Sequence, residues 1–358
     1  MAASLFCWFL FFTFAKNLQG QVRQSCWPSC DCVTDIKFLN CSYRGLTYVA
    51  GDFPPDTKHL DLSGNFLTAL HKGGFRLLWN LQVLLLSDNN ISSISEGAFS
   101  PLESLWKLDL SQNRISYLSK SFSLGLDSLR ELLLGENQLT FLDDGSFLHL
   151  DSLRRLDLSG NAIRSVQTRA FICTTTLREL DLQNNRLGYL PNGIFSSLRS
   201  LEVLNLSGNR IHSIEVGVLT PLISLALLDL SQNNLRTILF KTFLSLRTHG
   251  THLLLGRNPW HCDCDLQRVF RKLRRVRRLF LDDYRNLSCV EPAELRGHLL
   301  SRADAELCVA ETVTVLVITV TVVITVLAAI VMAETSKRNP IAKQGSEENT
   351  GLEDYTEN

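Results

Sequence analysis

The stretch LDLSQN at residues 108–113 decides the fold, because near copies of it recur along the chain at a fixed interval. The copies are LDLSGN at 60–65 and 156–161, LDLQNN at 180–185, LNLSGN at 204–209 and LDLSQN at 228–233. Asparagines fall every 24 residues from Asn65 to Asn233, and Asn258 follows after 25 residues. A fixed period of this length predicts a solenoid of stacked turns rather than a site built around single residues.

The leucines of the repeat have the spacing of a β-strand. Leucine stands five and three residues before each of these asparagines, so both side chains of a pair point into one core. The residues six and four before the asparagine point the other way, to solvent. Successive strands are expected to stack in parallel about 4.8 Å apart. The ladder asparagines, as we call them, are expected to bond backbone groups of neighbouring turns, since buried backbone polar groups need partners.

A second core row is expected on the return half of each turn. Phenylalanine stands ten residues after six of the ladder asparagines, at Phe75, Phe99, Phe147, Phe171, Phe195 and Phe243. Leu219 replaces it in one turn, and Phe122 lies only nine residues after Asn113, so we expect a local distortion there. No single turn can bury its own face, and the array therefore needs covered ends.

Ten cysteines favour an oxidising compartment. Eight of them form two groups that flank the repeats: Cys26, Cys30, Cys32 and Cys41, and Cys262, Cys264, Cys289 and Cys308. Zinc binding is the rival interpretation, and the extracellular topology inferred below argues against it. Cys7 falls in the expected leader, and Cys173 is left over, as a free thiol or an intermolecular disulfide. Four glycosylation sequons agree with secretion, at Asn40, Asn90, Asn205 and Asn286.

Two apolar runs predict the topology. Residues 5–15 form a run of the length found in secretory signals, with Gly20 available for cleavage. Residues 312–333 carry no charge and would reach about 33 Å as a helix, enough to cross a bilayer core. Lys337 and Arg338 follow this run, so the positive-inside rule places the C-terminus in the cytoplasm. We therefore expect a single-pass type I protein of the plasma membrane, with an extracellular N-terminus.

Composition and motifs exclude other classes of function. A formal net charge of zero argues against a nucleic-acid-binding protein. The eight histidines are scattered, and no nucleophile, metal or phosphate motif is present. We therefore expect neither an enzyme nor a bound cofactor or metal.

The chain resembles the extracellular leucine-rich-repeat proteins that carry cysteine caps at both ends. The repeat follows their LxxLxLxxNxL pattern, CWPSCDCVTDIKFLNC at 26–41 matches their N-terminal cap, and NPWHCDC at 258–264 begins their C-terminal cap. With the apolar segment, it is similar to the leucine-rich repeat and transmembrane domain proteins and their Slit-like relatives. The resemblance implies an α/β fold: a solenoid with a curved parallel sheet on its concave face, two disulfide caps and one membrane helix. It also implies the cysteine pairs 26–32, 30–41, 262–289 and 264–308, which spacing alone does not fix.

The expected organisation divides the chain into six parts. They are a signal peptide (1–20), an N-terminal cysteine cap (21–58), about nine leucine-rich repeats (59–256), a C-terminal cysteine cap (257–309), a transmembrane helix (310–333) and a cytoplasmic tail (334–358).

The outward residues of the strands form the first candidate binding face. This concave-face set consists of Asp61, Leu85, Lys107, Asp109, Glu131, Leu133, Arg155, Asp157, Glu179, Asp181 and Asp229. The aspartates either keep the strand surface soluble or dock basic and apolar groups of a partner. Asp157 and Asp181 are expected to repel each other, because they occupy adjacent strands.

The segment RVFRKLRRVRR at 268–278 is the second candidate. Its basic residues are Arg268, Arg271, Lys272, Arg274, Arg275, Arg277 and Arg278. Either they are a solvated surface of a cap helix, or they bind an acidic partner or sulfated glycan, since clustered arginines suit planar anions. The Slit-like resemblance adds sulfated glycosaminoglycans to the expected partners.

The sequence thus predicts a cell-surface receptor, adhesion molecule or co-receptor that binds an extracellular or membrane protein, with guidance receptors among the candidates. The alternative is an auxiliary subunit of an ion channel, which would act through its membrane and juxtamembrane segments.

Overall fold

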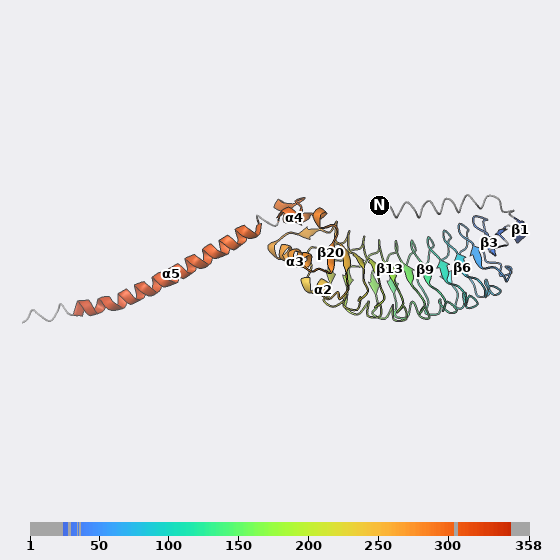
Figure 1. The fold of residues 1–358 in the computed structure, drawn as a ribbon, viewed down its shortest axis with the longest axis horizontal. Helices are drawn as coiled ribbons and strands as arrows, with labels where there is room; N and C mark the ends of the chain where they lie inside the picture. The colour runs from blue at the N-terminus through green and yellow to red at the C-terminus, as the bar shows by residue number, and fades with distance from the viewer. Residues whose placement is uncertain (1–23, 28–29, 34, 36, 304–306, 345–358) are drawn as a thin grey trace, which may run out of the picture. The chain divides into compact units, whose positions relative to one another are not determined.

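The computed structural model describes residues 24–27, 30–33, 35, 37–303 and 307–344 (Figure 1). The chain divides into two compact units, Met1–Ser301 and Arg302–Asn358, which we describe separately. The expected signal peptide lies outside the described residues.

One sheet of thirteen strands runs through the first unit, with its strands side by side along the stack (Figure 1). In spatial order they are β1(Gln24–Trp27), β2(Cys30–Val33), β3(Phe38–Asn40), β4(His59–Asp61), β6(Val83–Leu85), β8(Lys107–Asp109), β9(Glu131–Leu133), β11(Arg155–Asp157), β13(Glu179–Asp181), β15(Val203–Asn205), β17(Leu227–Asp229), β18(Thr251–Leu254) and β20(Leu279–Leu281). The strands from β3 to β20 are parallel, whereas β1 and β2 pair antiparallel at the N-terminal edge. Each repeat strand between β4 and β17 buries its middle leucine and leaves its two flanking residues partly or fully exposed.

The ladder asparagines tie each turn to the one before it, as the sequence predicts. Asn137 is typical: its Nδ2 donates to the carbonyl oxygens of Leu110, Leu134 and Gly135, and its Oδ1 accepts from the Ile115 amide. The same pattern recurs from Asn89 to Asn258. These side chains are buried, so the ladder satisfies backbone groups that water does not reach.

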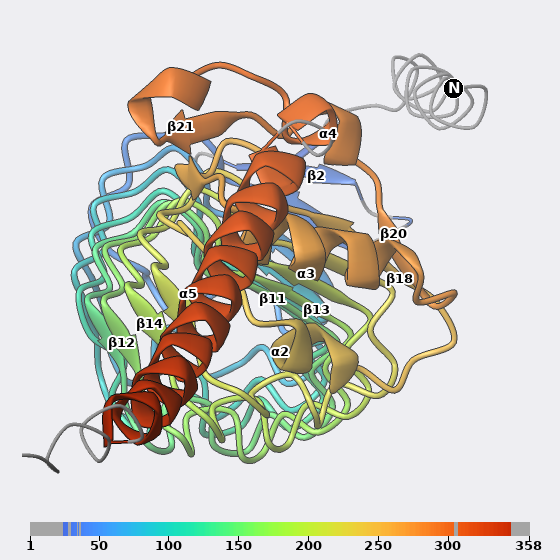
Figure 2. The same ribbon diagram turned by 90° about the vertical axis from the view of Figure 1, so that its left-hand side faces the viewer.

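The return side of the solenoid carries short strands and the aromatic row. The short strands pair as β5(Ala69–Leu70) with β7(Ser93–Ile94), β10(Phe141–Leu142) with β12(Ser165–Val166), β14(Tyr189–Leu190) with β16(Ser213–Ile214), and β19(Trp260–His261) with β21(Cys289–Glu291). The phenylalanines are buried, and the rings of Phe147 and Phe171 stack with centroids 5.7 Å apart. The view along the stack shows the turns superposed (Figure 2).

The turn that follows Asn113 is distorted, as its spacing predicts. It lacks the two-residue strand that the turns before and after it possess. Phe122 is still buried, but the next core leucine, Leu126, lies four positions after it, where three is the usual spacing. Gly125 lies in this extra step with φ of 87°, and its backbone lies against Ser100 of the preceding turn.

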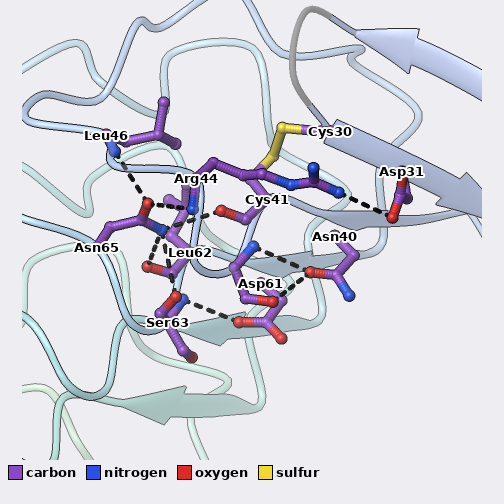
Figure 3. The surroundings of a disulfide bond; sticks show 11 residues. Cys30, Asp31, Asn40, Cys41, Arg44, Leu46, Asp61, Leu62, Ser63 and Asn65 are labelled. Carbon is purple, nitrogen blue, oxygen red and sulfur yellow. Dashed lines mark hydrogen bonds and ion pairs between the residues drawn. A yellow bond between two sulfur atoms is a disulfide. The ribbon is translucent and has the colours of Figure 1, made fainter.

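The N-terminal cap closes one end of the core through a disulfide and the first ladder asparagine (Figure 3). Cys30 is bonded to Cys41. Asn65 donates to the Cys41 carbonyl and accepts from the amides of Arg44 and Leu46, so the ladder continues into the cap.

The C-terminal cap closes the other end with α3(Cys264–Arg274) and α2(Phe240–Leu244) beside the last strands (Figure 2). Buried Trp260 meets Phe270 of α3 edge to face at 5.4 Å, and Cys262 is bonded to Cys289. The short segments η2(Tyr284–Asn286), η3(Ala293–Leu295) and α4(Leu300–Ala303) complete the cap.

Cys32 and Cys264 are also disulfide-bonded. The partners that the resemblance implies for them, Cys26 and Cys308, have side chains outside the described part of the chain. Cys173 is a free, half-buried thiol.

The second unit contains α5(Leu307–Gln344), which extends beyond the 310–333 expected for the membrane helix. Among the described residues it is the one helix long and apolar enough to cross a membrane, over Val313–Thr335. The hydroxyls of Thr321 and Thr325 bond carbonyls of their own helix, at Ile318 and Val322. The hydrogen bonds of these two hydroxyls are therefore made within the helix, and they give no support to the channel-subunit alternative.

Candidate functional site

The candidate face is formed by the outward residues of the large sheet, and we call it the sheet face. Strand register places its residues in two rows, one at each end of the three-residue strands. All eleven residues of the predicted concave-face set lie on it, along β4, β6, β8, β9, β11, β13 and β17.

The first row contains a chain of ion pairs across four adjacent turns. Lys107 Nζ lies 3.2 Å from Glu131, and Arg155 lies 3.8 Å from Glu131 and 3.1 Å from Glu179. The charges alternate in sign along this row, and direct register on β8, β9, β11 and β13 places each residue beside one of opposite charge. Such surface pairs contribute only about 0–1 kcal/mol each to stability.

The second row has a structural role that the sequence interpretation missed. Asp109 Oδ1 accepts from the backbone amide of Ser111 at 2.9 Å and from its hydroxyl at 2.6 Å. Asp61, Asp157, Asp181 and Asp229 each accept from the amide two residues later in the same way. These carboxylates therefore cap the backbone where the chain leaves the strand, besides facing solvent. Replacing Asp109 by arginine, which its exposure alone suggests is harmless, removes these bonds and is expected to destabilise the turn.

Asp157 and Asp181 are direct neighbours in this row, as predicted. Burial raises the pKa of Asp181, and the carboxylate of Asp157 raises it further. Hydrogen bonds from the Gln183 amide and the Asn205 side chain lower this pKa, but they do not cancel the effect of burial. The charged form of Asp181 is therefore less favourable in the folded protein than in the unfolded chain.

We expect Asp181→Asn to stabilise the protein at neutral pH and to lose this advantage in acid. The folded pKa of Asp181 lies above the unfolded value, so its unfavourable contribution is absent below the unfolded pKa and grows as pH rises through the folded pKa. Asparagine keeps an oxygen for the Gln183 amide. Urea unfolding of the full chain across this pH range measures the effect. Asp109→Asn is the control, because its register neighbours are the uncharged Leu85 and Leu133; an equal pH dependence in both variants would contradict the expectation.

A hollow of about 680 Å³ lies beside the ion-pair chain, where the chain enters the strands. Its lining residues are Ser104, Trp106, Ser128, Arg130, Glu131, Arg154, Arg155, Arg178 and Glu179. The sequence did not predict four of these residues as site residues: Trp106, Arg130, Arg154 and Arg178. Their regular spacing could have identified them, since each stands seven residues before a ladder asparagine.

The basic segment at 268–278 does not present its seven cations equally. Helix α3 ends at Arg274 and buries Phe270 and Leu273. Arg278 donates to the carbonyls of Leu246 and Leu244, and Arg274 lies 4.5 Å over the Tyr284 ring. These two arginines hold the cap together, so reversing their charge would not test anion binding cleanly.

Other cations of this segment also have contacts. Arg268 pairs with Asp265 at 3.0 Å, and Lys272 lies 5.8 Å from the Phe240 ring centroid. Arg275 and Arg277 are exposed beyond the end of α3. They are the members of the segment best placed to meet a ligand.

The sequons occupy different surfaces. Asn40 and Asn205 lie on the sheet face, in the same row as the aspartates. Asn286 is exposed in η2, and Asn90 follows a ladder asparagine. Within the described part of the chain, no group of three or more His, Cys, Asp or Glu residues could hold a metal ion.

The leucine rich repeat family model matches residues 55–115, 107–163, 127–187 and 175–235. Together these matches cover residues 55–235, about half of the chain. The chain belongs to the leucine-rich repeat family. Its relatives of this kind are adhesion- and receptor-like proteins, which are typically not enzymes.

Two solved structures resemble the chain over most of its length. Human 5T4, also called Wnt-activated inhibitory factor 1 or trophoblast glycoprotein, is 27% identical with a TM-score of 0.58, over 77% of this chain and 96% of that one. The FLRT2 leucine-rich repeat chain, from an octameric complex with Latrophilin 3 and Unc5D, is 26% identical with a TM-score of 0.60, over 79% and 100%.

Decorin is similar to the chain over a much shorter stretch. Chicken (Gallus gallus) decorin is 42% identical over 55 residues, 15% of each chain, and human (Homo sapiens) decorin is 35% identical over 71 residues, 20% of this chain and 19% of decorin. The chain thus matches at most about a fifth of the length of these curated relatives. The 5T4 and FLRT2 likenesses identify the chain as a repeat ectodomain with disulfide caps and an apolar C-terminal helix, consistent with a single-pass membrane protein.

Proposed function

We propose that the chain is a glycosylated type I protein of the plasma membrane that binds another extracellular or membrane protein through its sheet face. The ordered charge chain from Lys107 to Glu179 carries the proposal. Its side chains are at least partly exposed and already paired with one another, so binding would cost less ordering entropy than it would for unpaired side chains. The FLRT2 repeat chain, which is similar in fold, sits in a complex with Latrophilin 3 and Unc5D, which supports a protein as the ligand.

The position of the sequons supports the N-terminal two-thirds of the sheet face as the binding region. A glycan on Asn205 of β15 would cover the C-terminal strands, whereas a glycan on Asn40 would sit at the edge of the first repeat. The strands between them, from β4 to β13, would stay open and contain the charge chain.

We expect Glu131→Lys to weaken partner binding by about tenfold or more while leaving the fold intact. The change places three cations side by side at the centre of the face, and such a like-charge contact costs several kcal/mol against a complementary partner. The change removes two surface ion pairs and creates two like-charge contacts, so the free energy of unfolding is expected to fall by about 1–3 kcal/mol. Photo-crosslinking on living cells that express the full chain measures the effect, with Latrophilin 3 and Unc5D as the first proteins to be probed.

Glu96→Lys is the matched control, because Glu96 is exposed on the return side after β7. A surface protein whose crosslink survives Glu96→Lys and disappears with Glu131→Lys supports the proposal. The proposal is overturned if every crosslink to an extracellular protein persists in Glu131→Lys.

Arg275 and Arg277 carry a second proposed contact, with sulfated glycosaminoglycan. Two exposed guanidinium groups just beyond a helix end can pair with the sulfate oxygens of a glycosaminoglycan. We expect Arg275→Gln with Arg277→Gln to move elution of the full chain from heparin to lower salt. The pair Arg164→Gln with Arg186→Gln removes the same charge elsewhere; equal shifts in both pairs would show that net charge alone governs retention.

A further inference from the structure

Three arginines stand in register along one edge of the sheet face, and we call Arg130, Arg154 and Arg178 the arginine row. The Arg154 amide donates to the Arg130 carbonyl and the Arg178 amide to the Arg154 carbonyl, both at 2.8 Å. The Arg130 amide donates in the same way to the Trp106 carbonyl. This backbone ladder sets the four side chains at intervals of roughly 5 Å along the hollow, with Trp106 at one end.

The row carries more positive charge than its surroundings neutralise. Arg178 pairs with Glu202 at 3.1 Å, and the nearby Arg155 is taken up by the charge chain. In residues 37–303, no carboxylate forms an ion pair with Arg130 or Arg154. Like charges about 5 Å apart repel by roughly 0.8 kcal/mol even in water, so an arriving anion would relieve this repulsion as well as form bonds of its own.

The acids in the lining decide which kind of anion fits. Glu131 and Glu179 lie in the hollow, and Glu202 closes the row at its far end. A uniformly sulfated polysaccharide would bring negative charge against all three. An acidic segment of a protein can instead place carboxylates on Arg130 and Arg154 and neutral residues opposite the glutamates.

Trp106 also favours a protein segment. Its side chain is 39% exposed at the end of the row and offers an apolar surface beside the cations. Tryptophan and arginine are the residue types most enriched where protein partners bind strongly. Ser104 and Ser128 add hydroxyl donors along the same wall.

We propose that the arginine row and Trp106 form a docking groove for an extended acidic segment of the partner protein, with its carboxylates on Arg130 and Arg154. This deepens the proposed function, on which it rests, by naming the chemistry of the partner and a contact beside the sheet face.

The test uses the full chain in detergent micelles and a capped, fluorescein-labelled octapeptide of alternating glutamate and threonine. A glutamine–threonine octapeptide is the uncharged match. Fluorescence anisotropy is followed to about 1 mM peptide, where a few charge-assisted bonds already give measurable occupancy. We expect the acidic peptide to bind and the glutamine–threonine peptide not to bind. Binding should change the tryptophan fluorescence in a way that Trp106→Leu removes, and unlabelled acidic peptide should compete.

The decisive comparison is between two double variants of equal charge. Arg130→Gln with Arg154→Gln should weaken the affinity for the acidic peptide by about tenfold or more, since a lost hydrogen bond to a charged group costs about 1.5–3 kcal/mol. Arg164 and Arg186 are exposed on the side where the chain leaves the strands. Arg164→Gln with Arg186→Gln should change the affinity for the acidic peptide by about twofold or less at physiological salt.

Three outcomes overturn the inference: no binding of the acidic peptide, equal losses in the two double variants, or heparin displacing the peptide with an affinity that also depends on Arg130 and Arg154. The last outcome would make the groove a polyanion site. The crosslinking experiment with Glu131→Lys is independent of the peptide experiment. If the acidic peptide does not bind but a partner that depends on Glu131 is still crosslinked, the docking groove is refuted and the proposed function is not.

Discussion

Asn137→Ala is expected to lower the free energy of unfolding by about 2–4 kcal/mol. The side chain is buried and makes four hydrogen bonds, and its loss leaves the Ile115 amide without this partner, whereas the Leu110 carbonyl keeps a bond from Asn113. A buried backbone group without its partner costs about 1–3 kcal/mol. Chemical unfolding of the full chain, followed by tryptophan fluorescence, measures the loss.

The damage from Asn137→Ala should also be local. Turns of a solenoid contact their neighbours alone, so amide exchange should accelerate first in the turns around Ile115 and Asn137. Asn234→Ala is the control, because Asn234 is exposed and directly follows a ladder asparagine. A ladder whose bonds matter little would give Asn137→Ala and Asn234→Ala the same small effect.

The ladder could be predicted because it depends on one residue type at one interval. The backbone conformation beside each ladder asparagine could not be predicted from the residue type. The residue before each ladder asparagine adopts a positive φ, from 53° at Gln112 to 66° at Gly208. Only some of these positions are glycine, and Gln112, Glu136 and Gln232 take the same conformation. The surrounding turns impose it on residues that would not choose it alone.

The candidate site was predictable to a similar degree. Strand period alone places Lys107, Glu131 and Arg155 on one face, because alternation decides which side chains leave the core. The role of Asp109 as a cap for the Ser111 amide depends on a hydrogen bond two residues along, which periodicity does not reveal. Arg278 resembles its basic neighbours in sequence, but its guanidinium bonds two carbonyls more than thirty residues away.

The arginine row was missed for a different reason. Arg130, Arg154 and Arg178 recur at the repeat interval, but they stand one residue before the strand, where pattern analysis assigns no face. The backbone bonds between turns extend the register by that one residue. Periodic positions next to a strand therefore belong with the binding face when a solenoid sequence is interpreted.

Gly125→Ala is expected to be the most damaging change of a single glycine, at about 2–5 kcal/mol. A Cβ atom at this position would lie 2.5 Å from the Ser100 carbonyl oxygen and 2.6 Å from its Cα. These are backbone atoms of the preceding turn, which cannot swing aside as a side chain would. The φ of 87° adds strain of about 1–2 kcal/mol for a residue with a Cβ, and overpacking adds about 1–3 kcal/mol.

Gly73→Ala separates the two causes. Gly73 has a similar φ of 92°, but a Cβ built there meets no atom within 4 Å. Its substitution should therefore cost the backbone strain alone, about 1–2 kcal/mol. Thermal unfolding of both variants in the full chain gives the comparison. If the two costs agree within about 0.5 kcal/mol, the close approach to Ser100 has no energetic weight. A larger loss for Gly125→Ala means that the displaced Phe122 is accommodated only because the extra residue in this turn has no side chain.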